Sequence, residues 1–314
     1  MRSILKRTQF TARTGGRPPA AVELSPEGVL AAALPVARLR RGVPAIGHSP
    51  VYAFVPLPQD ALVPAIDAPN LRHPEAVAAA IRAALGETAL RTRSVTLILP
   101  DLLVRVFVLD FDSLPAKYAE AVSVVRFRLR KMVPFDVEPA GVSYQPLAQN
   151  DSECKVLAAV IPGPILAEYE GAVRDAGYEP GAVLASSLAA LEAADAMEGV
   201  LAANLGARSI TTAVASGNSL LLYRTIDLPS DPGLRAGEIA RAIAVAAAYF
   251  EDKLGSPPQR LHYAGTQNPD EFARSIGALP VTIVEWPGRP EEGALTQIPQ
   301  TSFAGVLGAL AGAS

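Results

Sequence analysis

The residue types that most often carry out catalysis or bind metals are few in this chain and lie far apart. There are three histidines and one cysteine: His48, His73, His262 and Cys154. None of them forms the paired Cys/His spacing of a zinc site, and no local pattern supports a Ser/His/Asp triad. The P-loop, the Gly-x-Gly-x-x-Gly turn, the Gly-x-Ser-x-Gly elbow and His-Glu-x-x-His are all missing. With one cysteine, no disulfide can form within the chain, which fits a reducing compartment.

The composition of the chain excludes several classes of protein. Of 314 residues, 50% are hydrophobic and 19% are charged, which predicts a folded chain of about two domains. The formal net charge of -3 argues against nucleic-acid binding, which usually requires a basic excess. The basic and polar N-terminus does not resemble a signal peptide, and no apolar run reaches the roughly 18 residues of a membrane span. We therefore expect a soluble cytoplasmic protein.

Strand and helix patterns alternate along most of the chain. A hairpin is expected around residues 21–32, loops and edge strands in the proline-rich residues 35–74, and a helix from residue 75. Later strands and helices are expected as far as a small-residue helix at residues 303–311. The pattern predicts an α/β fold. Two units each begin with a strand–turn–strand, near Val22 and near Asn204, which indicates a weak internal duplication.

The clearest helix is predicted over residues 115–133. An apolar stripe follows its length in steps of three and four: Tyr118, Val122, Val125, Leu129 and Met132. Cations are crowded at its end: Arg126, Arg128, Arg130 and Lys131. They suit the negative end of the helix dipole. Either they form a solvated helix face or they form a docking surface for an acidic or membrane partner, and the sequence leaves both interpretations open.

The order of elements and several short motifs resemble the PilM family of actin-like proteins in type IV pilus assembly. Residues 94–147 carry the family's inserted strands and helix, with Leu99-Pro100-Asp101, Pro134-Phe135-Asp136 and Tyr144-Gln145-Pro146-Leu147. The resemblance extends over about residues 20–312. It implies a duplicated actin-like, ribonuclease H-like fold with a small α/β insertion subdomain.

The resemblance also implies the domain boundaries. We expect a disordered lead-in at residues 1–19, and the first actin-like subdomain begins at residues 20–93. The insertion follows at residues 94–180, and the chain returns to the first half at residues 181–199. The second half covers residues 200–298, and a C-terminal helix at residues 299–314 packs back on the core.

In this family a nucleotide lies between the two hairpins, and the resemblance assigns a vestigial nucleotide site to eight residues: Glu23, Ser25, Asn204, Gly206, Ala207, Ser209, Gly265 and Thr266. The family's first hairpin reads Asp-Ile-Gly with a later lysine, and its second hairpin also begins with Asp. Here Leu30 stands at the lysine position and Asn204 at the second aspartate, while Pro26 removes a backbone donor. We therefore expect no catalytic residue, no metal ion and no tight binding of ATP and magnesium.

The function implied by the resemblance is that of a scaffold at the inner membrane. PilM proteins bind the cytoplasmic N-terminal tail of PilN, so a PilN-like tail and other pilus assembly proteins are the expected partners. The expected location is cytoplasmic and peripheral at the inner membrane. Two alternatives stay open: a working actin-like ATPase or kinase in which Glu23 and Glu27 replace the aspartates, and an actin-like component of type II secretion.

Overall fold

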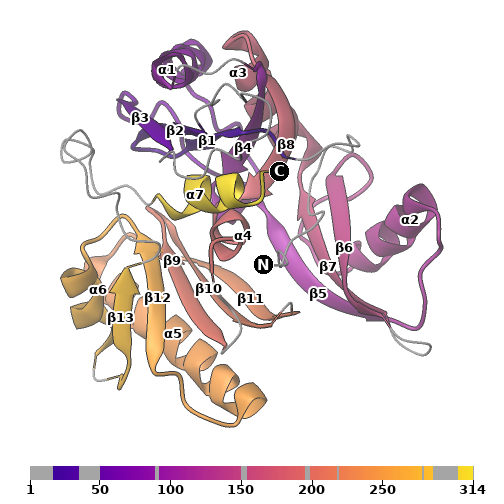
Figure 1. The fold of residues 1–314 in the computed structure, drawn as a ribbon, viewed down its shortest axis with the longest axis vertical. Coiled ribbons are helices and arrows are strands. Elements are labelled where there is room, and N and C mark those ends of the chain that lie inside the picture. Colours follow the sequence, from indigo (N-terminus) through magenta and orange to yellow (C-terminus); the bar gives the residue numbers. More distant parts are fainter. Residues whose placement is uncertain are drawn as a thin grey trace, which may run out of the picture.

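A computed structural model of the protein describes residues 17–34, 50–88, 92–149, 154–194, 199–217, 219–277, 279–285 and 303–313. Its elements appear in three groups along the chain, with a final helix (Figure 1). The first group is β1 (Ala20–Leu24), β2 (Gly28–Ala33), β3 (Val51–Pro56), α1 (Pro74–Glu87), β4 (Ser94–Leu99) and the 3-10 turn η1 (Asp101–Leu103). The second group is β5 (Arg105–Phe111), α2 (Tyr118–Leu129), β6 (Gly141–Gln149) and β7 (Cys154–Ile161).

The chain then returns to the first group before it enters the last. The returning elements are α3 (Gly163–Asp175), β8 (Glu179–Ala185) and α4 (Ser186–Leu191). The third group is β9 (Val200–Leu205), β10 (Ser209–Ser216), β11 (Ser219–Asp227), α5 (Pro232–Leu254), β12 (Arg260–Gly265), α6 (Pro269–Ile276) and β13 (Thr282–Glu285), and α7 (Ala304–Ala311) ends the described chain.

Two five-stranded sheets share one topology. Their strand orders are β3-β2-β1-β4-β8 and β11-β10-β9-β12-β13. In each sheet the first three strands of the unit pair antiparallel, and the last two add in parallel. The duplication expected from the two hairpins is therefore confirmed, since each unit builds the same sheet in the same order.

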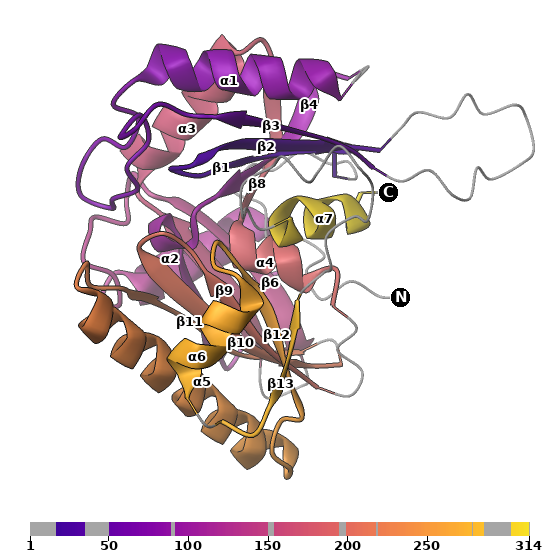
Figure 2. The same cartoon turned by 90° about the vertical axis from the view of Figure 1, so that its left-hand side faces the viewer.

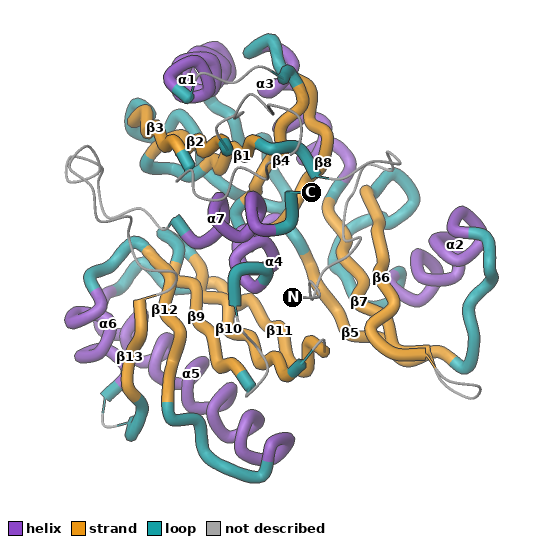
Figure 3. The backbone as a smooth tube through the Cα atoms, viewed as in Figure 1, coloured by secondary structure: helices purple, strands orange, loops and turns teal. Residues whose placement is uncertain are grey.

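Helices cover the sheets on the outside and fill the space between them. α1 and α3 lie on the outer face of the first sheet, and α5 and α6 cover the second (Figures 1 and 2). α4 and α7 pack against each other between the two sheets. Figure 3 shows that both lie where the halves meet.

Local sequence explains where the long helix α5 begins and ends. The Asp231 carboxylate accepts a hydrogen bond from the Leu234 amide at 2.9 Å, and Pro232 occupies the first turn, where no amide donor is needed. At the other end Gly255 adopts a left-handed conformation with φ of 75°. Buried positions between these ends, such as Ile239, Ile243 and Phe250, form one face against the second sheet.

The insertion is smaller than the sequence predicted. Its antiparallel sheet has the order β5-β7-β6 and packs with α2 around its own core. β4 and β8 pair with each other in the first five-stranded sheet, and α3 packs on α1. The expected boundaries at residues 94 and 180 are therefore corrected to about the start of β5 and the end of β7. The sequence missed them because the parallel pairing of β4 and β8 is a long-range contact that strand patterns alone do not reveal.

Two other expectations also need correction. α2 is shorter than residues 115–133, and its buried side chains are Ala121, Val125 and Leu129. Tyr118 and Met132, at the ends of the expected apolar stripe, are 43% and 42% exposed. The small Ala121 lies on the buried face because the helix packs closely on its sheet.

The expected lead-in at residues 1–19 is ordered at its end. Residues 1–16 lie outside the described part, but Arg17 is buried and forms an ion pair with Glu192 at 3.2 Å. The Arg17 guanidinium also lies directly against Gly312, at the end of α7. It thus joins the carboxyl ends of α4 and α7, where a cation suits both helix dipoles.

The contact between α4 and α7 depends on a glycine. A Cβ atom added to Gly308 would lie 1.8 Å from the Ala189 carbonyl oxygen, a distance that real atoms do not reach. We predict that Gly308→Ala lowers the free energy of unfolding by about 1–3 kcal/mol, because α7 must move away from α4. The matched change Gly237→Ala, on the exposed face of α5 with no atom within 4 Å, should raise it by about 0.5–1 kcal/mol. Chemical denaturation measures both changes, and equal effects would contradict the assigned role of Gly308.

Candidate functional site

A cleft between the two actin-like halves gathers the turns of both hairpins. Its volume is about 750 Å³, including the space open to solvent. Seven of the eight residues assigned from the sequence line this cleft: Glu23, Ser25, Asn204, Gly206, Ala207, Ser209 and Thr266. The eighth, Gly265, lies at the end of β12 beside it, where an added Cβ would come within 2.8 Å of the Leu205 carbonyl oxygen. The structure therefore brings the predicted set together, although what the set binds stays a prediction.

Glu23, near the end of β1, turns its carboxylate toward the protein. Its Oε1 atom accepts a hydrogen bond from the Ser186 hydroxyl at 2.6 Å. Its Oε2 atom is buried against Gly305 in α7, without a hydrogen-bond partner among the described residues. Burial raises the pKa of Glu23 to about 7; the Ser186 hydrogen bond and the Val306 amide oppose this shift, and nearby Asp101 and Glu27 add to it. This carboxylate therefore helps to position the first turn of α7.

Asp101, which sequence reasoning did not assign to the site, is the most highly connected side chain of the cleft. It is buried directly after β4, and it accepts hydrogen bonds from the Ser187 amide at 2.9 Å, from the Ser187 hydroxyl and from the Tyr223 hydroxyl at 3.0 Å. Burial raises the pKa of Asp101 although these hydrogen bonds lower it. A signal was present in the sequence, because a carboxylate at the end of a parallel strand faces the ligand-binding edge of an α/β sheet.

Asn204 connects this network to the second half. Its amide donates to Asp101 Oδ2 at 3.3 Å, to the Ser186 hydroxyl at 3.2 Å and to the Ser187 hydroxyl at 3.0 Å. An aspartate at this position would place a second carboxylate beside Asp101 and would lack the donor. The amide thus fits this position, and hydrogen bonds run from β1, η1 and α4 across to β9 and β11.

The turn of the first hairpin satisfies its own polar groups. The Ser25 hydroxyl donates to the Gly28 carbonyl oxygen at 3.1 Å and accepts from the Gly28 amide at 3.3 Å. The Ser25 amide also donates to the Gly28 carbonyl oxygen, at 3.0 Å. Pro26 has no amide hydrogen. Most donors of this turn are therefore already bonded within it.

The turn of the second hairpin is held in the same way, partly by a side chain that sequence reasoning missed. Arg235, in the first turns of α5, donates to the carbonyl oxygens of Ala207 at 2.9 Å and Gly206 at 3.0 Å. The Gly206 amide donates to the Ser209 carbonyl oxygen, and the Thr266 amide donates to the Leu205 carbonyl oxygen. No sequence pattern joins Arg235 to a turn 28 residues earlier.

The titratable side chains that line the cleft are mainly acidic. Glu23, Glu27 and Asp101 line it together with one cation, Arg208. Among the described residues no three Asp, Glu, His or Cys side chains lie close enough to share a metal ion. Within the same ranges, no helix is both long and apolar enough to cross a bilayer.

Together, the duplicated sheets, the insertion in the first half and the cleft between two hairpin turns define an actin-like fold. No protein-family model matches the chain, and no curated protein matches it in sequence. Among solved structures, the PilM-PilN type IV pilus biogenesis complex is similar with a TM-score of 0.68 and 19% identity, over 96% of this chain and 100% of that chain. The resemblance to PilM is therefore confirmed for the fold.

Two further structures show weaker similarity. One is the cytoplasmic domain of EpsL, an inner membrane component of the type II secretion system of Vibrio cholerae, with a TM-score of 0.46 and 15% identity over 79% of this chain and 82% of that chain. The other is a Bacteroides thetaiotaomicron protein with an actin-like ATPase fold and unknown function. Its TM-score is 0.49, and it is 12% identical over 84% of this chain and 88% of that chain.

The raised pKa of Glu23 predicts a dependence of stability on pH. Because the native pKa of about 7 lies above the unfolded value of 4.5, folding favours the protonated carboxyl group, and this stabilisation is lost as the pH rises through 7. Glu23→Gln keeps the shape without the titration. We expect the variant and the wild type to unfold alike at pH 4, below the unfolded pKa, and the variant to be more stable at pH 8 by up to about 3 kcal/mol. Parallel denaturation profiles of the two proteins across this pH range would contradict the prediction.

Proposed function

We propose that this chain is a non-catalytic scaffold of type IV pilus assembly that binds the cytoplasmic tail of a PilN-like inner-membrane protein. Binding to such a tail would hold it in the cytoplasm at the inner membrane, in contact with other pilus assembly proteins. The similarity to PilM across nearly the whole chain, including the insertion, supports this role over that of a generic actin-like protein. The observation that carries the non-catalytic part is the hydrogen-bond network around Asp101.

That network leaves a poor site for a magnesium–triphosphate complex. Such a site needs carboxylates that face magnesium-bound water and amides or cations that face phosphate. Here Glu23 faces Ser186 and α7, whereas Asp101 faces Ser187, Tyr223 and Asn204. Each lost charged hydrogen bond costs about 1.5–3 kcal/mol, so losing several would reduce a micromolar affinity to about the millimolar range.

A groove on the first half, beside its border with the insertion, fits the tail of a partner. It lies between residues 66–69 and the start of α3, directly after β7 ends, and it encloses about 650 Å³ including open space. Its walls are mostly apolar: Ile66, Pro69, Pro162, Pro164 and Ile165. An extended peptide bound in an apolar groove is a common mode of recognition.

The acidic side chains of this groove also indicate the partner's charge. The Glu168 carboxylate accepts hydrogen bonds from the amides of Asn70 and Leu71, at 2.9 Å and 2.6 Å, and it thereby fixes one wall. Asp67 is exposed at the same wall. A tail with apolar residues and a nearby cation would match this lining, because the cation could pair with Asp67.

Calorimetric titration with the synthetic N-terminal tail of the PilN-like protein from the same organism tests the proposal. We predict saturable binding by the wild type and a loss of at least about ten-fold in affinity for Ala68→Arg, because the exposed Ala68 lines the groove and a large side chain would fill it. The matched control Ala248→Arg, on the exposed face of α5 in the other half, should bind like the wild type. Absence of binding by the wild type would overturn the assignment of this partner.

Thermal unfolding with Mg-ATP tests the non-catalytic part separately. A ligand present at its dissociation constant stabilises the folded state by only about 0.4 kcal/mol. We therefore expect millimolar Mg-ATP to shift the midpoint by no more than about 1–2 °C. A shift of many degrees, together with ATP hydrolysis, would favour a working ATPase or kinase instead.

A further inference from the structure

The outer face of α2 combines exposed apolar and basic side chains on the insertion. We name this surface the α2 outer face and define it by Val124, Phe127, Arg128 and Lys131. Phe127 is 69% exposed, more than any other large hydrophobic side chain of the described residues, and Val124 is also exposed. Arg128 and Lys131 are exposed as well. On α2, Val124 lies three residues from Phe127 and four from Arg128, away from the buried Ala121, Val125 and Leu129. Lys131 lies in the turn directly after the helix.

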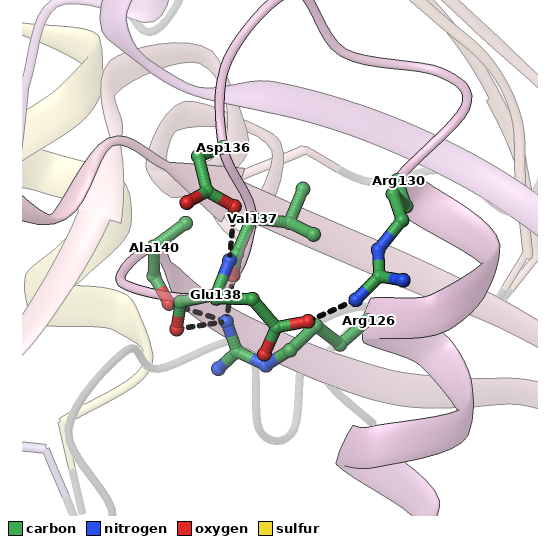
Figure 4. Close-up of polar contacts among 6 residues, drawn as sticks. All are labelled: Arg126, Arg130, Asp136, Val137, Glu138 and Ala140. Carbon is green, nitrogen blue, oxygen red and sulfur yellow. Dashed lines mark hydrogen bonds and ion pairs between the residues drawn. The ribbon is translucent and has the colours of Figure 1, made fainter.

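Two other cations at the end of α2 already have structural contacts. Arg126 donates to the carbonyl oxygens of Val137, Glu138 and Ala140, and Arg130 forms an ion pair with Glu138 (Figure 4). These contacts attach the end of α2 to the loop before β6. In contrast, Arg128 and Lys131 form no ion pair within the described part of the chain. Two of the four cations at this end of the helix thus contact the loop before β6, and two form no ion pair among the described residues. Arg130 also lies over the Phe127 ring, 6.0 Å from its centroid.

The position and shape of this surface favour a flat partner. α2 lies at the outer edge of the insertion, on the side away from the two five-stranded sheets (Figure 1). A helix that projects outward is convex, whereas a peptide partner usually needs a groove. An aromatic side chain between cations is typical of helices that lie in the interface of a membrane with anionic lipids.

We infer that the α2 outer face docks directly on an anionic membrane surface, with Phe127 entering the headgroup region and with Arg128 and Lys131 close to lipid phosphates. Two cations and one aromatic ring give a weak and reversible contact, since stable anchoring takes more than one signal. The contact therefore orients the insertion against the bilayer. It is separate from the groove at residues 66–69 and does not depend on a bound tail.

Flotation of the full chain with lipid vesicles tests this inference without any partner protein. One set of vesicles contains phosphatidylcholine alone, and the other also contains about 30% phosphatidylglycerol. We expect flotation with the anionic vesicles only, and its loss in about 0.5 M salt because the attraction is electrostatic. Phe127→Ser/Arg128→Glu should lower the partition coefficient by at least about ten-fold.

A matched control shows whether a loss of flotation comes from the change in this surface or from the change in net charge. Leu234→Ser/Arg260→Glu also removes one exposed large apolar side chain and reverses one exposed cation, but in the second half. It should float like the wild type, and both variants should keep the wild-type melting temperature. The inference is overturned if the wild type stays unbound to anionic vesicles, which would redirect the surface to an acidic protein partner, or if the control loses flotation equally.

Testing each variant in the other binding assay shows whether lipid binding and tail binding use separate surfaces. Phe127→Ser/Arg128→Glu should still bind the tail peptide, and Ala68→Arg should still float with anionic vesicles. If Ala68→Arg also abolished flotation, the α2 outer face would not be the lipid contact. Failure of the tail titration, by contrast, leaves the flotation result unchanged.

Discussion

The buried carboxylate of Asp101 sets the arrangement of the centre of this molecule. A carboxylate removed from water must be hydrogen-bonded, and its partners here come from α4, β9 and β11. Those partners fix the two halves relative to each other, because Asn204 and Tyr223 belong to the second half. Losing one donor would leave a buried acceptor unsatisfied, which is more costly than the hydrogen bond itself is stabilising.

The helix pair α4 and α7 is the apolar counterpart of this network. Gly308 allows the two backbones to approach, Glu23 lies at the start of α7, and Arg17 with Glu192 lies at the other end. Segments from both ends of the described chain therefore meet at the junction of the halves. A junction that is filled by helices and bridged by hydrogen bonds favours one relative position of the halves.

The surfaces proposed for binding lie away from this rigid centre. The groove at residues 66–69 lies at the border of the insertion and the α2 outer face lies on the insertion, whereas most donors of the first hairpin turn in the cleft are already bonded. Both surfaces expose apolar side chains, which a site that recognises a peptide or a membrane needs.

The sequence by itself determined the kinds of elements and the duplicated hairpins, because periodicity and turn residues are local signals, and its resemblance to the PilM family supplied the set of residues that meets in the cleft. It did not determine which strands close the first sheet, so the limits of the insertion at residues 94 and 180 were wrong. Nor did it reveal Asp101 or Arg235 as parts of the site. Only the tertiary structure decided these points, because a parallel strand pair and a hydrogen bond between halves join residues whose separation along the chain leaves no local pattern.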